Sequence, residues 1–134
     1  MSNSQDEKVK DASFQEQVAP WVQACFGAEI ASNVRERNHR FIEESLELVQ
    51  AQGCSKEDVL KMVDYVYDRP VGDPPQEVGG VMVTLACLCL AADMDMHDAG
   101  EVELARIWTK IEQIRKKQQT KPQHSPLPIP QDLK

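Results

Sequence analysis

The sequence predicts an all-α protein, a bundle of four to five helices. Strand signals are nearly absent, because outside residues 63–67 no β-branched or aromatic run alternates with period two between turn residues. Apolar residues instead recur at helical spacing, and glycine or proline residues separate the helical segments. A chain of 134 residues is long enough for one domain with its own core and too short for two.

The first two helices are expected over residues 13–26 and 28–52. Pro20 breaks or kinks the first helix, since proline lacks the amide hydrogen that a helix interior uses, and Gly27 ends it. Gly53 follows the second helix and suits the left-handed backbone that often closes a helix. The second helix therefore carries the long charged segment in the middle of the chain.

The later helices also have clear start and end signals in the sequence. Ser55, followed by acidic residues, resembles a helix-starting box, so a third helix is expected from there to Asp68. Residues 69–76 form a connection rich in proline. The fourth helix, residues 77–93, holds an apolar run that is too short to span a bilayer and is expected to be buried. A last helix is expected over residues 95–119.

The two ends of the chain differ from the helical domain, which is expected over residues 12–119. Residues 1–11 are polar and charged, without the apolar stretch of a secretory signal, and are expected to be a disordered tail. Residues 120–134 contain repeated prolines and are expected to be an extended, disordered tail. No transmembrane segment is expected.

Composition narrows the functional classes. The net charge of −7 argues against binding nucleic-acid polymers, because such proteins need a basic surface that releases counterions from phosphates. An acidic site that recruits cations fits this charge better. The four cysteines contain no CxxC pair and the three histidines have no metal-ligand spacing, which argues against zinc. We expect reduced thiols and a cytoplasmic protein.

Three glutamates of the second helix, Glu43, Glu44 and Glu47, fall within an arc of about 100°, with Arg40 one turn earlier. One interpretation is the solvated face of an amphipathic helix, in which Arg40 pairs with the glutamates three and four residues later. The other is a divalent-metal site, since Mg²⁺ takes carboxylate oxygens together with water and phosphate oxygens. The spacing alone leaves both open.

The start of the fourth helix carries two further unusual features. Glu77 either complements the helix dipole or faces the second helix as a metal ligand. Gly79 and Gly80 each cost about 1 kcal/mol relative to alanine inside a helix. They indicate either close packing of another helix or close approach of a ligand.

These residues resemble the MazG-like all-α NTP pyrophosphohydrolase superfamily, in which an EExxE motif precedes a helix that begins ExxD. The first motif is present as residues 43–47, and the second reads Glu77-Val78-Gly79-Gly80. Gly80 therefore stands where the family has its fourth acidic ligand, an aspartate. Residues 37–41, 63–70, 77–85 and 121–128 are similar to the bacterial and phage branch, so the resemblance covers most of the chain from Trp21 onward.

The resemblance implies hydrolysis of a nucleoside triphosphate between its α and β phosphates, with Mg²⁺ or Mn²⁺ as the cofactor. Similarity to phage members implies dGTP or GTP as the substrate and a role in supplying nucleotides for 2-aminoadenine synthesis. Glu44, Glu47 and Glu77 are implied metal ligands, and Glu43 is another ligand or orients the attacking water. The ligand that is missing at Gly80 is a water, a substrate oxygen or a carboxylate such as Asp64 or Asp73.

Candidate substrate-binding residues fall into two groups. Positive partners for the triphosphate are expected at Arg40 and on the last helix at Arg106, Lys110 and Arg115, although each is alternatively an exposed charge in a surface ion pair. Aromatic and amide side chains can stack on a base or read its edge. The candidates of this kind are Trp21, Asn38, Phe41 and Tyr65, of which Trp21 and Phe41 are alternatively core residues.

The apolar fourth helix needs cover on all sides, which few helices of one chain can give, so a homodimer or homotetramer is expected. The family's members are also oligomeric. Two rival functions remain. One is hydrolysis of another nucleotide, dUTP or phosphoribosyl-ATP. The other is a noncatalytic helical module that binds a partner through Trp21 and the apolar helix.

Overall fold

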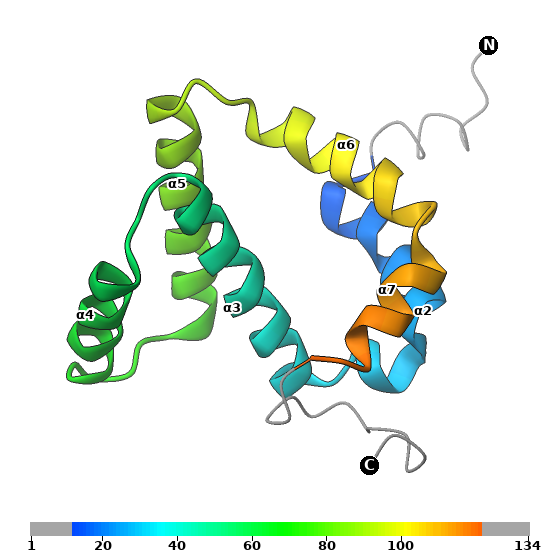
Figure 1. Ribbon diagram of the computed structural model, residues 1–134, viewed down its shortest axis with the longest axis horizontal. Coiled ribbons are helices and arrows are strands. Elements are labelled where there is room, and N and C mark those ends of the chain that lie inside the picture. The colour runs from blue at the N-terminus through cyan, green and yellow to red at the C-terminus, as the bar shows by residue number, and fades with distance from the viewer. Residues whose placement is uncertain (1–11, 122–134) are drawn as a thin grey trace. The chain divides into compact units, whose positions relative to one another are not determined.

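A computed structural model describes residues 12–121 of the chain. Within this range the chain forms six helices and no strand (Figure 1), which confirms the all-α prediction. The tail expected over residues 1–11 lies outside the described residues, and so does the tail of residues 120–134 apart from its first two residues.

The helices belong to two compact units. The first unit contains the described residues up to His39 and from Gly100 onward, and the second contains Arg40–Ala99. The division passes through two helices, α3, Val34–Ala51, and α6, Met96–Trp108. The helical domain expected over residues 12–119 therefore consists of two units that share these helices.

The first unit begins with α2, Phe14–Ala31, which is capped by the hydroxyl of Ser13. Pro20 lies inside this helix, whereas the break falls at Gly27, whose φ of 81° is open to glycine but strained for other residues. The chain resumes helical geometry after Gly27 and continues to Ala31. The predicted break at Gly27 is confirmed.

The second helix starts later than expected. The side chain of Asn33 accepts a hydrogen bond from the Glu36 amide at 3.1 Å, so α3 begins at Val34. The expectation of one helix over residues 28–52 is wrong at its start, because Asn33 satisfies a free amide at this end and favours a new N-terminus. The predicted end is confirmed: Gly53 has a φ of 87°, and the Cys54 amide donates to the Val49 carbonyl.

The last predicted helix, residues 95–119, is two helices, α6 and α7, Ile111–Gln118. The hydroxyl of Thr109 donates to the Arg106 carbonyl at 2.7 Å, and its amide donates to the same carbonyl at 3.1 Å. Such local bonds compete with the helix backbone, which explains why the single helix was wrong. Helix α2 packs against α7.

The small core of the first unit combines apolar and polar side chains. Cys25 on α2 and Leu104 on α6 are buried. Glu36 is fully buried as well, and one of its carboxylate oxygens accepts a hydrogen bond from the side-chain amide of Gln118. Burial raises the pKa of the Cys25 thiol, although the positive charges of Arg115 and Arg37 oppose this effect.

The second unit contains the C-terminal part of α3 together with α4, Lys56–Tyr67, and α5, Pro74–Ala91 (Figure 1). Ser55 caps α4 by accepting a hydrogen bond from the Asp58 amide at 3.1 Å, as predicted. Residues 63–67, the one strand-like patch of the sequence, lie inside α4. Two prolines open α5 three residues before the expected start, because the first turn of a helix needs no amide hydrogens.

The apolar helix α5 is mostly exposed. Cys89 is its one buried residue. The expectation that this helix is buried is therefore wrong for a single chain, because the described helices are too few to surround it. By length and composition, α5 is also the one helix of the described range that is apolar enough to cross a membrane.

Candidate functional site

The EExxE motif occupies the middle of α3, in the second unit. Its first glutamate, Glu43, pairs with Arg40, whose Nη1 lies 2.6 Å from Glu43 Oε2. The two side chains are 15% and 25% exposed, so this pair is better shielded from solvent than an ordinary surface salt bridge. This ion pair is the one expected if the glutamates form the solvated face of an amphipathic helix, and it places a guanidinium beside the motif.

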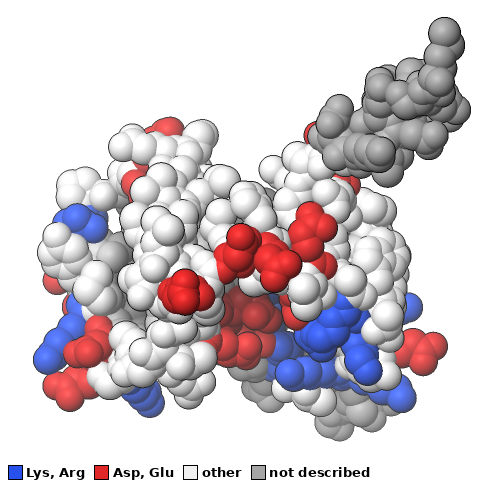
Figure 2. Space-filling view, turned by 90° about the horizontal axis from the view of Figure 1, so that it is seen from above, with Lys and Arg blue, Asp and Glu red and all other residues white. Residues whose placement is uncertain are grey.

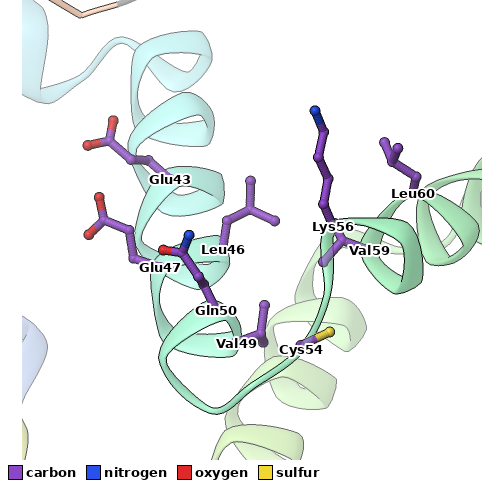
Figure 3. Close-up of a pocket in the computed structure, with 9 residues that line it drawn as sticks. All are labelled: Glu43, Leu46, Glu47, Val49, Gln50, Cys54, Lys56, Val59 and Leu60. Atoms are coloured by element: carbon purple, nitrogen blue, oxygen red, sulfur yellow. The ribbon is translucent and has the colours of Figure 1, made fainter.

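Glu43 and Glu47 line a pocket of about 420 Å³ between α3 and α4. Figure 3 shows their carboxylates on the same side of α3, with the amide of Gln50 beside Glu47. Lys56 extends from the start of α4 on the other side of the pocket, and Leu46 lies between the amine and the carboxylates. The pocket is therefore lined mainly by apolar side chains, with Lys56 at one edge and the two carboxylates at the other, where they point away from the lysine.

Glu44 points to a different part of the unit. It lines a second groove, of about 520 Å³, between α3 and α5. Phe41 and Leu48 share this groove with Val81 and Leu85 of α5. Glu43 and Glu47 thus line the pocket between α3 and α4, with their carboxylates directed away from α4 in Figure 3, whereas Glu44 lines the groove between α3 and α5.

Glu77 lies in the first turn of α5, and its amide donates to the Asp73 carbonyl at 3.0 Å. Its side chain folds back over Gly72, since a Cβ added at Gly72 would collide with the Glu77 carboxylate. Glu77 is one turn before Val81, which borders the groove that also contains Glu44. Gly72 therefore lets the Glu77 carboxylate lie against the connection that precedes α5.

No group of three or more acidic, histidine or cysteine side chains within residues 12–121 lies close enough to hold a metal ion. The four glutamates thus do not form one closed cluster within a single copy of the chain. A pair of carboxylates is nevertheless a common protein contribution to a Mg²⁺ site, where water and phosphate oxygens supply the other ligands. Glu43 and Glu47, one helical turn apart, form such a pair.

Gly80, where the resemblance leads us to expect an aspartate, has open space around it. A Cβ added at Gly80 would meet no atom within 4 Å. Gly80 follows Glu77 by three residues, so the two lie on the same side of α5. Nothing in the described chain explains the absence of a side chain there. Asp64 and Asp73, the two acids considered as replacements, are both exposed.

Two proposed base-binding aromatics already have neighbours within their own units. The indole N–H of Trp21 donates to the Ile107 carbonyl at 3.1 Å, and its ring meets Phe26 edge to face. This geometry joins α2 to the end of α6. Tyr65 is covered on one face by the guanidinium of Arg69, 4.3 Å from the ring centre. One face of the Tyr65 ring remains available for stacking.

The remaining substrate candidates are mostly solvent-facing. Asn38 and Lys110 are exposed. Arg106 forms a two-pronged contact with Glu103, at 2.6 and 2.9 Å, and this hydrogen bonding lowers the pKa of Glu103. Cationic side chains gather on the first unit in the face that Figure 2 shows. The acidic motif belongs to the second unit.

Sequence reasoning missed three polar residues of the pocket, Gln50, Cys54 and Lys56. The sequence contained a signal for these residues in Gly53. The short turn around Gly53 reverses the direction of the chain and brings the start of α4 beside the end of α3. It also missed the buried carboxylate of Glu36. Asn33 three residues before a glutamate is a recognised helix-start pattern, which could have located this end.

Comparison of the chain with models of protein families, with curated proteins and with solved structures finds no match. The fold and the site define an all-helical protein in which two carboxylates, one helical turn apart, border a pocket that also contains a lysine.

Proposed function

We propose that this protein is a metal-dependent nucleotide pyrophosphohydrolase that converts a nucleoside triphosphate to the monophosphate and pyrophosphate. The observation that carries the proposal is the pair Glu43 and Glu47 on one side of the pocket that also contains Lys56. Its volume of about 420 Å³ is within the usual range of about 300–1,000 Å³ for small-molecule sites. The class of reaction, pyrophosphohydrolysis, is proposed from the resemblance that includes the EExxE motif.

The donor set suits a hard cation, because carboxylate oxygens are the ligands that Mg²⁺ and Mn²⁺ prefer. A bound divalent ion would neutralise phosphate charge and lower the pKa of an attacking water. Hydrolysis adds the oxygen of one water to the α-phosphorus, and the bond to the bridging oxygen breaks to release pyrophosphate. Glu44 and Glu77 are proposed to complete the acidic site from the α5 side.

The chain's own residues have distinct proposed tasks. Arg40 holds the Glu43 carboxylate through the ion pair described above, which fixes its orientation. Lys56 supplies a point charge that can bind a phosphate oxygen. The apolar residues Leu46, Val59 and Leu60 line the same pocket and offer an apolar surface to the nucleotide. Together these residues would orient the triphosphate along the acidic side of α3.

The favoured substrate is proposed from the resemblance to be dGTP or GTP, with a role in supplying nucleotides for 2-aminoadenine synthesis in a phage-infected cell. The proposed location is the cytoplasm, and the proposed working form is a homodimer or homotetramer. The exposed Tyr65 and Phe41, at 56% and 54%, are available for stacking on a base in the second unit.

The test is a panel of eight ribo- and deoxyribonucleoside triphosphates with Mg²⁺ or Mn²⁺, with products separated by chromatography. We expect a monophosphate and pyrophosphate in equal amounts, fastest with dGTP or GTP, and no product when the metal is chelated. Release of inorganic phosphate with a diphosphate would indicate a different reaction. If no nucleotide is hydrolysed under any condition, a noncatalytic helical module becomes the better account.

Replacing Gly80 by aspartate is expected to strengthen metal binding. The position has space for a side chain and lies on the same side of α5 as Glu77, so an added carboxylate joins the acidic site. We expect the Mn²⁺ concentration for half-maximal hydrolysis to fall by about tenfold, because ligand charge tunes affinity for hard cations. Gly80→Asn is the control, since it adds a similar volume without charge. An equal effect of both variants would contradict the prediction.

A further inference from the structure

The two carboxylates that border the pocket between α3 and α4 stand between two hydrogen-bond donors on the same helix. Arg40 precedes Glu43 by three residues. Gln50 follows Glu47 by the same number. At about 100° per residue, all four side chains leave α3 within an arc of about 80°. Residues three apart on a helix are neighbours, so each carboxylate has one donor within reach.

The donor at the first end of this row is bonded to its carboxylate. Arg40 Nη1 lies 2.6 Å from Glu43 Oε2. A charge-assisted contact of this length restricts the direction of the carboxylate. An ionised carboxylate has about four lone-pair positions, so Glu43 keeps positions for a cation while Arg40 holds it.

The donor at the second end lies near its carboxylate without a hydrogen bond. Gln50 lines the same pocket as Glu47, and Figure 3 shows its carboxamide beside that glutamate. Within residues 12–121 the Glu47 side chain makes no hydrogen bond or ion pair. The last torsion of a glutamine side chain is broad, so the carboxamide can turn its N–H groups toward Glu47 while the backbone stays in place.

We propose that Gln50 is the positioning residue of Glu47 when a divalent cation is bound. Its amide donates a hydrogen bond to one carboxylate oxygen and directs the other oxygen toward the cation. The inference rests on the proposed function, because it concerns the loaded form of that site. Carboxylates that ligate metals are usually hydrogen-bonded by a further side chain, and loss of that partner typically weakens metal binding by about 10–100-fold.

A neutral donor suits the second end of the row better than another cation. Glu43, Glu47 and Arg40 together carry one net negative charge, from two carboxylates and one guanidinium. A second positive side chain would cancel this charge and repel a divalent ion. A carboxamide donates N–H groups and adds no charge. Gln50 can therefore orient Glu47 without lowering the attraction of the site for a cation.

Direct ligation by Gln50 fits the spacing less well. At 1.5 Å per residue, Gln50 is about 4.5 Å beyond Glu47 and about 10.5 Å beyond Glu43 along the axis of α3. Side chains of a helix tilt toward its N-terminus, so Gln50 leans toward the level of Glu47. To reach a cation shared by both glutamates, Gln50 would have to extend past Glu47. The spacing thus favours contact with the Glu47 carboxylate.

The first test measures Mn²⁺ binding by the full chain in the presence of a dGTP analogue with a methylene group between its α and β phosphates. Electron paramagnetic resonance follows the free Mn²⁺. Gln50→Met keeps the length of the side chain and removes the amide, so we expect a dissociation constant about tenfold higher. Gln52→Met is the matched control, because Gln52 lies beyond the end of α3 and outside the pocket. Its dissociation constant should change less than about twofold.

A double-mutant cycle tests whether Gln50 acts through Glu47. In a chain that already carries Glu47→Gln, no carboxylate remains for Gln50 to orient. Adding Gln50→Met there should change the Mn²⁺ dissociation constant by less than about twofold, because the two residues act as one unit. A separate role, such as ligating the cation or reading the base, predicts instead that the two losses multiply.

Thermal unfolding separates positioning from a structural role. Gln50 makes no hydrogen bond within the described residues, so Gln50→Met should leave the midpoint without metal unchanged. With Mn²⁺ and the analogue present, the rise in the midpoint should be smaller than in the unaltered chain, because ligand binding stabilises in proportion to affinity. A lower midpoint without metal, together with unchanged Mn²⁺ affinity, would indicate a structural role and overturn the proposal.

The outcomes distinguish this inference from the proposed function. Equal Mn²⁺ binding by the unaltered chain and Gln50→Met, equal losses in Gln50→Met and Gln52→Met, or multiplied losses in the cycle would overturn the role of Gln50. The proposed function would stand in each of these cases. No Mn²⁺ binding by the unaltered chain would overturn both.

Discussion

Glu47→Gln is expected to reduce pyrophosphate release by about 10²–10³-fold while leaving the fold intact. The amide keeps the shape of the side chain but removes the charge that attracts the divalent ion and, through it, the phosphates. The side chain of Glu47 makes no hydrogen bond or ion pair within residues 12–121, so the substitution removes no such bond from the folded state. The measurement is the steady-state rate of pyrophosphate formation together with the thermal midpoint.

The matched control is Glu57→Gln. Glu57 lies on α4, is 79% exposed and pairs with Lys61 at 3.3 Å, so its charge is outside the pocket. Its replacement should change the rate less than twofold. Glu44→Gln is expected to abolish activity as well, because Glu44 is assigned to the acidic site from the α5 side. Retained activity in both Glu44→Gln and Glu47→Gln would discard the assignment of this site.

Trp21→Ala is expected to lower the free energy of unfolding by about 2–4 kcal/mol. The substitution removes a large side chain between α2 and α6 and leaves the Ile107 carbonyl without its indole donor. That carbonyl is at the C-terminal end of α6, where it also accepts a hydrogen bond from the Lys110 amide at 3.1 Å, so the substitution removes one of its two donors. Urea denaturation followed by circular dichroism gives the change in stability.

Trp108→Ala provides the comparison, since Trp108 is the other tryptophan and is 43% exposed. We expect it to destabilise the chain by less than half as much. If Trp21 instead serves as a platform for the base, its replacement raises KM for the nucleotide and leaves the unfolding midpoint in place. That outcome would contradict the structural role assigned from the Trp21 contacts.

Helix boundaries were predictable where one residue dominates the local geometry. Ser55 and Gly53 fixed the turn between α3 and α4, because capping and a left-handed backbone need no distant partner. The breaks near Asn33 and Thr109 were missed. The break near Thr109 depends on a side chain bonding to the backbone next to it, an option that such residues have at many positions where the helix nevertheless continues. The break at Asn33 had a sequence signal, the asparagine three residues before Glu36.

The positions of the acidic residues were only partly predictable. An arc of about 100° placed Glu43, Glu44 and Glu47 on one broad face of a helix. Helical periodicity does not predict which neighbouring helix lies beside each glutamate. Glu43 and Glu47 line the pocket between α3 and α4 and Glu44 lines the groove between α3 and α5, because the turn at Gly53 determines where α4 returns. The presence of Lys56 in the same pocket as Glu43 and Glu47 follows from that turn.

The exposure of α5 could not be read from its composition. An apolar helix is expected to be covered, but composition does not state whether the cover comes from the same chain. Gly79 and Gly80 are the more informative residues of this helix. Within the described residues, no neighbouring atom lies so close to either glycine that a side chain could not fit.

The most direct test of the account is the binding of Mn²⁺ in the presence of a nucleotide analogue that cannot be cleaved between its α and β phosphates. Free Mn²⁺ is followed by electron paramagnetic resonance during titration of the full chain, of Glu47→Gln and of Glu57→Gln. The account predicts saturable binding that needs the analogue, at least about tenfold weaker binding in Glu47→Gln, and no change in Glu57→Gln. Equal Mn²⁺ binding by all three proteins, or none by the unaltered chain, would contradict it.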